Sequence, residues 1–129
     1  MYEHEQAFIR AFVVREQRGR FLGWVRFRHS RNIFVNEIGS AGILDPRYAK
    51  LIPAAEHDVE GLLARLRNLG APKQCYLISN CEDIDEQTMD LREGLEACHR
   101  CPIETIVSCI PGKLALLDSE VDLWLCIRR

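Results

Sequence analysis

The sequence predicts an α+β fold: a single compact domain over residues 1–129, with a helical N-terminal part followed by a βαβ unit and an antiparallel meander that form a mixed sheet. Three observations predict it. The 129 residues are 47% apolar and 28% charged, which suits one hydrophobic core and leaves little room for a second. Apolar residues recur at helical spacing in the middle of the chain, and short runs of strand formers between turn residues fill its last third.

The middle helix is the simplest element to justify. Five apolar residues share one of its faces at helical spacing: Val59, Leu62, Leu63, Leu66 and Leu69. Asp58 can cap the N-terminus by accepting a hydrogen bond from a free backbone N–H. At the other end Gly70 can adopt a left-handed conformation, and Pro72 prevents continuation. The pattern predicts an amphipathic helix with one buried face.

A strand, a helix and a second strand follow. Residues 74–79 are short, apolar and rich in strand formers. Asp90 can cap the next helix with Glu93 as its capping-box partner, and the helix should end before Pro102. Residues 103–110 then form a strand. A strand-helix-strand connection of this length favours parallel pairing with a right-handed crossover, so we expect the two strands to be parallel neighbours.

The chain closes with two further strands. Pro111 and Gly112 form a turn, residues 114–117 return antiparallel, and residues 123–127 make the last strand. We expect this last strand to be available for edge pairing, so a homo-oligomer stays an open alternative.

The N-terminal third fits two periods. Residues 7–14 and 21–27 can form a hairpin, or two short amphipathic helices. Helix formers are common between the apolar residues, which favours helices. Ser30 is expected to cap a further helix, and Asp45 followed by proline to start a short one.

The sequence predicts a cytoplasmic protein with no membrane contact. No apolar run approaches the roughly 20 residues that a transmembrane helix needs, and the first residues lack the basic region of a signal peptide. In a reducing compartment the cysteines are expected to be thiols or metal ligands rather than disulfides. They are Cys75, Cys81, Cys98, Cys101, Cys109 and Cys126.

Parallel pairing of residues 74–79 with residues 103–110 would bring the carboxyl ends of both strands to one sheet edge, where open sheets bind ligands. The catalytic candidates at this edge are Cys109, Asp83 and Asp85. The ligand-binding candidates are Ser79, Asn80, Glu82 and Lys113. The alternative is a solvated acidic loop beside an ordinary turn.

Cys98 and Cys101 form the only close cysteine pair, which is typical of redox motifs and of half a zinc site. The redox interpretation fails because the pair lies at a helix C-terminus, where the helix dipole disfavours a thiolate. Zinc would need two more ligands from elsewhere, so burial of Cys98 in the core is the simpler interpretation. We expect no cofactor.

Charge is distributed unevenly along the chain. Residues 1–31 hold seven arginines against three glutamates, while residues 82–122 hold eleven acids against three bases. Arginines alternate with aromatic residues near the N-terminus, as in surfaces on which single-stranded nucleic acid stacks. The candidates are Arg15, Arg18, Arg20, Arg26 and Arg28. The alternative is a solvated cationic face over core aromatics.

No complete catalytic set is visible, so the sequence leaves open whether the protein is an enzyme. We expect a non-enzymatic binding or regulatory domain that recognises another protein through its charged surfaces. Two alternatives stay open: a small enzyme or ligand-binding protein using the strand ends, and nucleic-acid binding through the arginine-rich third.

Overall fold

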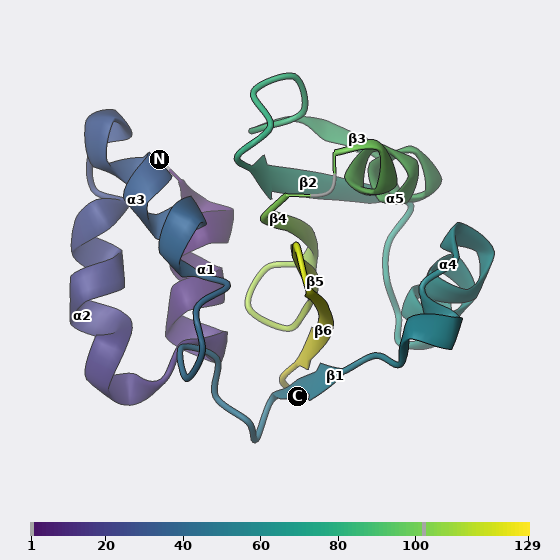
Figure 1. Ribbon diagram of the computed structural model, residues 1–129, viewed down its shortest axis with the longest axis horizontal. Coiled ribbons are helices and arrows are strands. Elements are labelled where there is room, and N and C mark those ends of the chain that lie inside the picture. Colours follow the sequence, from purple (N-terminus) through teal and green to yellow (C-terminus); the bar gives the residue numbers. More distant parts are fainter. Residues whose placement is uncertain (1, 102) are drawn as a thin grey trace.

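The computed structural model describes residues 2–101 and 103–129. Within them, five helices, one 3₁₀ turn and six strands follow one another along the chain (Figure 1). The elements are α1 (Glu3–Phe12), α2 (Arg15–Trp24), α3 (Arg28–Glu37), β1 (Ala49–Leu51), η1 (Ala54–Glu56), α4 (Val59–Asn68), β2 (Gln74–Ser79), β3 (Thr88–Asp90), α5 (Leu91–Arg100), β4 (Thr105–Ile110), β5 (Leu114–Ser119) and β6 (Asp122–Ile127).

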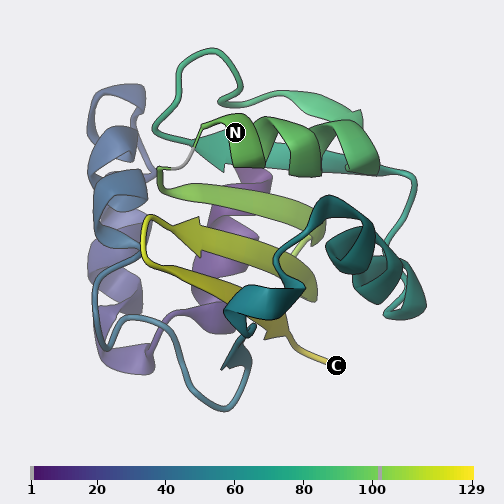
Figure 2. The same ribbon diagram turned by 45° about the vertical axis from the view of Figure 1, so that its right-hand side comes forward.

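The sheet lies between two layers of helices. Helices α1, α2 and α3 cover one face, and α4 and α5 cover the other (Figures 1 and 2). The α+β prediction and the helical N-terminal part are therefore confirmed.

The central strands are apolar without alternation because both of their faces are covered. In β4, Ile106 packs into the core beneath α1–α3, whereas its neighbour Val107 packs into the core beneath α4 and α5. Successive strand residues point to opposite faces, so a strand in the middle layer buries nearly every side chain.

The sheet is antiparallel, not mixed. The strand order is β1-β6-β5-β4-β2-β3, and every ladder among the described residues is antiparallel. In particular β2 pairs antiparallel with β4, with Tyr76 opposite Ser108, so the predicted parallel pairing is wrong. The reason is β3, three residues that return beside β2 before α5 begins. This extra reversal changes the direction in which the chain enters β4.

The last strand also differs from its prediction. It pairs on both sides, with β5 and with β1, so it is not an edge. The outer strands of the sheet are β1 and β3. Strand β1 replaces the short helix expected after Asp45: the Asp45 carbonyl accepts from the N–H groups of Tyr48 and Ala49 in a single turn, and the chain then extends.

Caps explain where several helices begin. Asp58 accepts a hydrogen bond from the Gly61 N–H at 3.0 Å, as predicted for α4. Asp90 precedes α5 as predicted, without a side-chain cap bond. The expected cap at Ser30 is wrong: α3 begins at Arg28, and the Ser30 hydroxyl donates back to the Trp24 carbonyl at 2.7 Å.

Candidate functional site

The antiparallel pairing separates the residues that were expected to share one sheet edge. Ser79 ends β2 opposite Thr105, the first residue of β4, whereas Cys109 lies near the other end of β4. Lys113 follows in the turn between β4 and β5. The loop from Asn80 to Gln87 and the pair Cys109 and Lys113 therefore lie at opposite ends of the strands, and no common site joins them.

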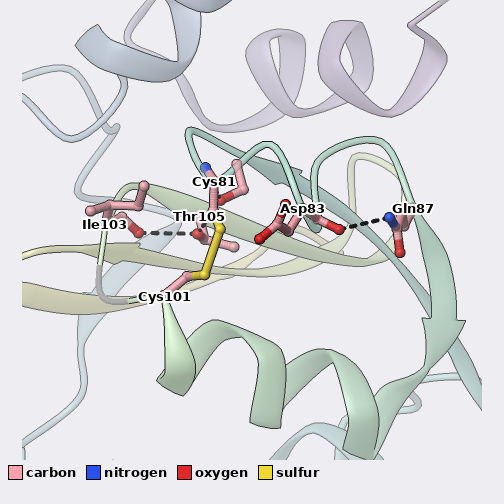
Figure 3. The surroundings of a disulfide bond; sticks show 7 residues. Cys81, Asp83, Gln87, Cys101, Ile103 and Thr105 are labelled. Atoms are coloured by element: carbon pink, nitrogen blue, oxygen red, sulfur yellow. Dashed lines mark hydrogen bonds between the residues drawn. A yellow bond between two sulfur atoms is a disulfide. The ribbon is translucent and has the colours of Figure 1, made fainter.

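The polar residues after β2 have structural partners. The Ser79 and Thr105 hydroxyls are 2.7 Å apart and buried. The Asn80 amide donates to the Asn36 side chain at 2.7 Å. Glu82 and Asp83 are exposed in the loop, where the Asp83 carbonyl accepts from the Gln87 amide at 2.8 Å (Figure 3).

Cys109 lacks the properties of a nucleophile. Its side chain is buried, and burial raises the pKa of its thiol to about 12. The thiolate is the reactive form, so this burial disfavours reaction at Cys109 near neutral pH. Burial likewise raises the pKa values of Cys75 and Cys126 to about 12.

Cys81 and Cys101 form a disulfide, which corrects the expectation of thiols or metal ligands for these two cysteines (Figure 3). The other four cysteines are free, as expected. It joins the loop after β2 to the residue that follows α5. Cys98 does not join Cys101 in a common site, because its side chain is buried in the core, 3.4 Å from an Asp118 oxygen. The described residues contain no group of three or more metal-ligating side chains.

A buried ionic cluster joins α1, α3 and the loop after β2. Arg31 donates to Glu5 at 3.0 and 2.7 Å and to Asp85 at 2.7 and 3.0 Å. Burial alone would lower the pKa of Arg31, but the hydrogen bonds to Asp85 and Glu5 outweigh it, so the pKa rises and Arg31 stays charged. Asp85 also accepts from the Ser79 N–H at 2.9 Å, so this catalytic candidate serves as an ion-pair partner.

The cluster continues onto the sheet. The Tyr76 hydroxyl donates to Glu5 at 2.9 Å, and burial raises its pKa, with the Glu5 charge adding to the effect. His4 stacks on Tyr76, with ring centroids 4.6 Å apart, and its Nδ1 lies 2.8 Å from the Ser108 hydroxyl. Ser108 is only 2% exposed. These groups hold the helix layer on the sheet, and the burial of Ser108 argues against a serine nucleophile.

The arginine-rich segment forms an outer surface of the helix layer. Arg15, Arg20, Arg26 and Arg28 are exposed, and Arg18 is half-buried with its guanidinium donating to the Val13 carbonyl at 2.9 Å. Arg28 pairs with Glu86 at 3.0 Å. The aromatic residues of this segment differ in burial: Phe21 is fully buried, whereas Phe27 is 57% exposed.

An extended hollow lies on the other side of the sheet, between the end of α4 and strands β1 and β6. We call it the basic groove. Its floor is apolar, formed by Leu69, Leu125 and Ile127, and Leu51 of the outer strand β1 borders it. The main cavity is about 670 Å³, and two adjoining cavities of about 390 and 310 Å³ share its lining. Leu69 is 36% exposed, so the floor is open to solvent near the end of α4.

Cations surround the basic groove. Lys50, Lys113 and Arg129 line its cavities, and none of them has an ion-pair partner in the part of the chain that the structure describes. The one acidic residue of the main cavity, Glu56, is paired with Arg65 at 3.4 Å. The groove therefore combines exposed apolar surface with unneutralised positive charge.

A second hollow of about 480 Å³ has the opposite charge. It lies between the loop after α3 and the turn between β5 and β6, and its lining includes Glu104, Glu120, Asp122 and Trp124. No basic residue lines it.

Sequence reasoning identified Lys113 but assigned it to the wrong end of the sheet, and it missed Lys50 and Leu51 because β1 was expected to be helical. The available signal was the mixture of cations and apolar residues in the last five residues, from Leu125 to Arg129. No helix among the described residues has the length and apolarity needed to cross a membrane. Comparisons of the chain with protein-family models, with curated proteins and with solved structures find no match to any of them.

Proposed function

We propose that the protein is a binding domain that recognises another protein through the basic groove. The observation that supports this most directly is an open apolar floor beside cations that have no carboxylate partner among the described residues. Apolar surface that stays exposed in a folded chain is typical of interaction sites.

The chemistry of the groove defines the partner. Leu69, beside the floor residues Leu125 and Ile127, offers apolar surface, which stabilises a complex when a partner's side chains cover it. Lys50 and Lys113 would attract carboxylates and disfavour basic partners. The expected partner is therefore a protein segment in which apolar anchors stand next to acidic residues.

Selection from a random-peptide library displayed on phage tests this proposal. Selected against the intact chain, the library should yield peptides that combine acidic and apolar residues. In a direct titration, Lys50→Glu/Lys113→Glu should weaken binding of a selected peptide by about tenfold or more, because two attractions become repulsions.

A matched variant controls for net charge. Arg67 and Arg100 are exposed and line none of the three cavities of the groove, so Arg67→Glu/Arg100→Glu changes the total charge equally and should leave the peptide's affinity unchanged. The proposal fails if no peptide is enriched, if the enriched peptides lack acids, or if both variants weaken binding alike.

Self-association would replace the proposal. The acidic hollow and the basic groove could meet between two copies, because their charges are complementary. Sedimentation over a range of concentrations would then show an oligomer that Lys50→Glu/Lys113→Glu disrupts. Another protein as the partner requires that a second copy does not cover the basic groove.

A cytoplasmic location belongs to the same proposal. The buried free cysteines, Cys75, Cys98, Cys109 and Cys126, support it, whereas the Cys81–Cys101 disulfide is more common in oxidising compartments. Fractionation of cells that express the tagged chain would decide between the cytoplasm and an oxidising compartment.

A further inference from the structure

Helix α2 contributes unusually little to the core. Of its ten residues only Phe21 is fully buried, while Leu22 and Trp24 pack against the core and stay partly exposed. It forms the outer side of the α1–α3 layer, remote from the sheet (Figure 1). The opposite face of α2 packs against no other element of the described chain, so it is open to another molecule.

Two glycines lie on that outward face. Gly19 and Gly23 are four residues apart, so they are neighbours on one side of the helix. A Cβ added at either position would meet nothing within 4 Å. Glycine is the least favourable residue in a helix interior after proline, and no contact within the chain requires it here. The glycines leave bare backbone that another molecule can approach closely.

Unpaired cations flank the glycines. Arg15 and Arg26 are exposed and have no acidic partner in the described part of the chain. The Arg20 guanidinium lies 5.1 Å from the centroid of the Trp24 ring, which orients it without neutralising it. Glu16 is the one acidic residue between positions 15 and 29, against five arginines, of which Arg28 is paired with Glu86. The surface therefore carries a net positive potential.

An exposed aromatic pair completes the surface. Phe27 is 57% exposed and stacks on His29, with ring centroids 5.6 Å apart and an angle of 15° between the planes. A flat ring held open to solvent between Arg26 and Arg28 offers a face on which an unpaired base can stack.

We propose that this surface, from Arg15 to His29, binds single-stranded nucleic acid. Arg15, Arg20 and Arg26 would contact phosphates, and Phe27 would stack with a base. Gly19 and Gly23 would let the strand lie against the helix backbone. A single strand fits better than a duplex, because the bases of a duplex are already stacked and cannot reach Phe27. The surface lies on the opposite layer from the basic groove, so this inference does not rest on the proposed protein partner.

Fluorescence anisotropy with a labelled oligothymidylate of about 12 nucleotides tests the proposal on the intact chain. With three or four phosphate contacts, affinity should fall roughly 20- to 50-fold between about 50 and 200 mM salt. Phe27→Ala should weaken binding at least about fivefold through lost stacking. Gly19→Ala should raise the thermal midpoint and still weaken binding, a combination that a purely structural glycine would not give.

The charge control uses residues that touch neither surface. Arg15→Glu/Arg26→Glu should abolish oligothymidylate binding, whereas Arg67→Glu/Arg100→Glu, with the same net charge, should retain it. The proposal is overturned if the oligonucleotide does not bind at low salt, or if both variants lose affinity equally. It is also overturned if polyglutamate competes as well as unlabelled oligothymidylate, because the site would then be a general polyanion site.

Discussion

Replacing Arg31 with methionine should destabilise the fold strongly. Arg31 has a side chain only 6% exposed, and it is the cation between two carboxylates, of which Glu5 is completely buried. Methionine approximates the arginine stem and removes the charge. The variant leaves Glu5 with a hydrogen bond from Tyr76 and no counter-ion, while its Oε1 already has no partner.

Removing one partner of a buried ion pair typically costs about 3–5 kcal/mol, which is a large part of the roughly 5–15 kcal/mol that stabilises a domain. Equilibrium unfolding in urea measures the difference. Arg28→Met is the matched control: Arg28 also pairs with the acidic loop, through Glu86, but its side chain is 75% exposed. This exposed pair should contribute less than about 1 kcal/mol.

Measurements at lower pH distinguish the cost of a buried Glu5 carboxylate without a counter-ion from the cost of lost side-chain packing. Without Arg31, the folded variant holds an uncompensated buried charge at Glu5, which the unfolded chain exposes to water. The deficit of Arg31→Met relative to the unsubstituted protein should therefore shrink as the pH falls towards about 4 and grow towards neutrality. A deficit that is equal to that of Arg28→Met, or that does not change with pH, would refute the ionic account.

Three further predictions concern stability and reactivity. A Cβ at Gly94 would collide with the Cys75 sulfur, so Gly94→Ala should cost about 1–3 kcal/mol in urea unfolding, and an unchanged midpoint would contradict this packing. Burial lowers the pKa of His4, so the unfolded chain binds the proton first and stability should decline as the pH falls below about 6.5; His4→Gln should flatten the decline. Iodoacetamide should modify none of the cysteines in the folded, unreduced protein and only Cys81 and Cys101 after mild reduction, because burial raises the thiol pKa values of the other four. Mass spectrometry of the labelled protein checks this. Labelling of Cys75 without reduction would contradict it.

Sequence patterns predicted the elements whose determinants are local. The apolar stripe and the Asp58 cap located α4 because both the stripe and its stop signals lie within the helix and its flanking residues. The helical N-terminal third was also predicted, since helix formers outnumber strand formers between its aromatic residues. The predicted cap at Ser30 was wrong for an equally local reason. Its hydroxyl donates to the Trp24 carbonyl instead of capping the helix that contains it.

Strand direction was not predictable in this way, because it depends on an element too short to recognise. Thr88 to Asp90 form a strand through pairing with β2, not through their own propensity. That single reversal makes β2 and β4 antiparallel and moves Cys109 to the opposite end of the sheet from Asp83. The expected common site at the strand ends depended on this direction, so Cys109 and Lys113 do not lie beside Asp83 as expected.

The positions of the charges show which of them are available for recognition. The formal net charge of −2 suggests mutual neutralisation, but of the arginines in the first third only Arg28 and Arg31 form ion pairs with the acidic loop after β2. Arg31 is buried in the core, where its ion pairs with Glu5 and Asp85 hold two layers together. Arg15 and Arg26, like Lys50 and Lys113 on the far side of the sheet, remain without carboxylates among the described residues. Two positive surfaces on opposite layers, one with an apolar floor and one with an exposed aromatic ring, therefore require different ligands, and paired charge reversals at Lys50/Lys113 and at Arg15/Arg26 separate their effects.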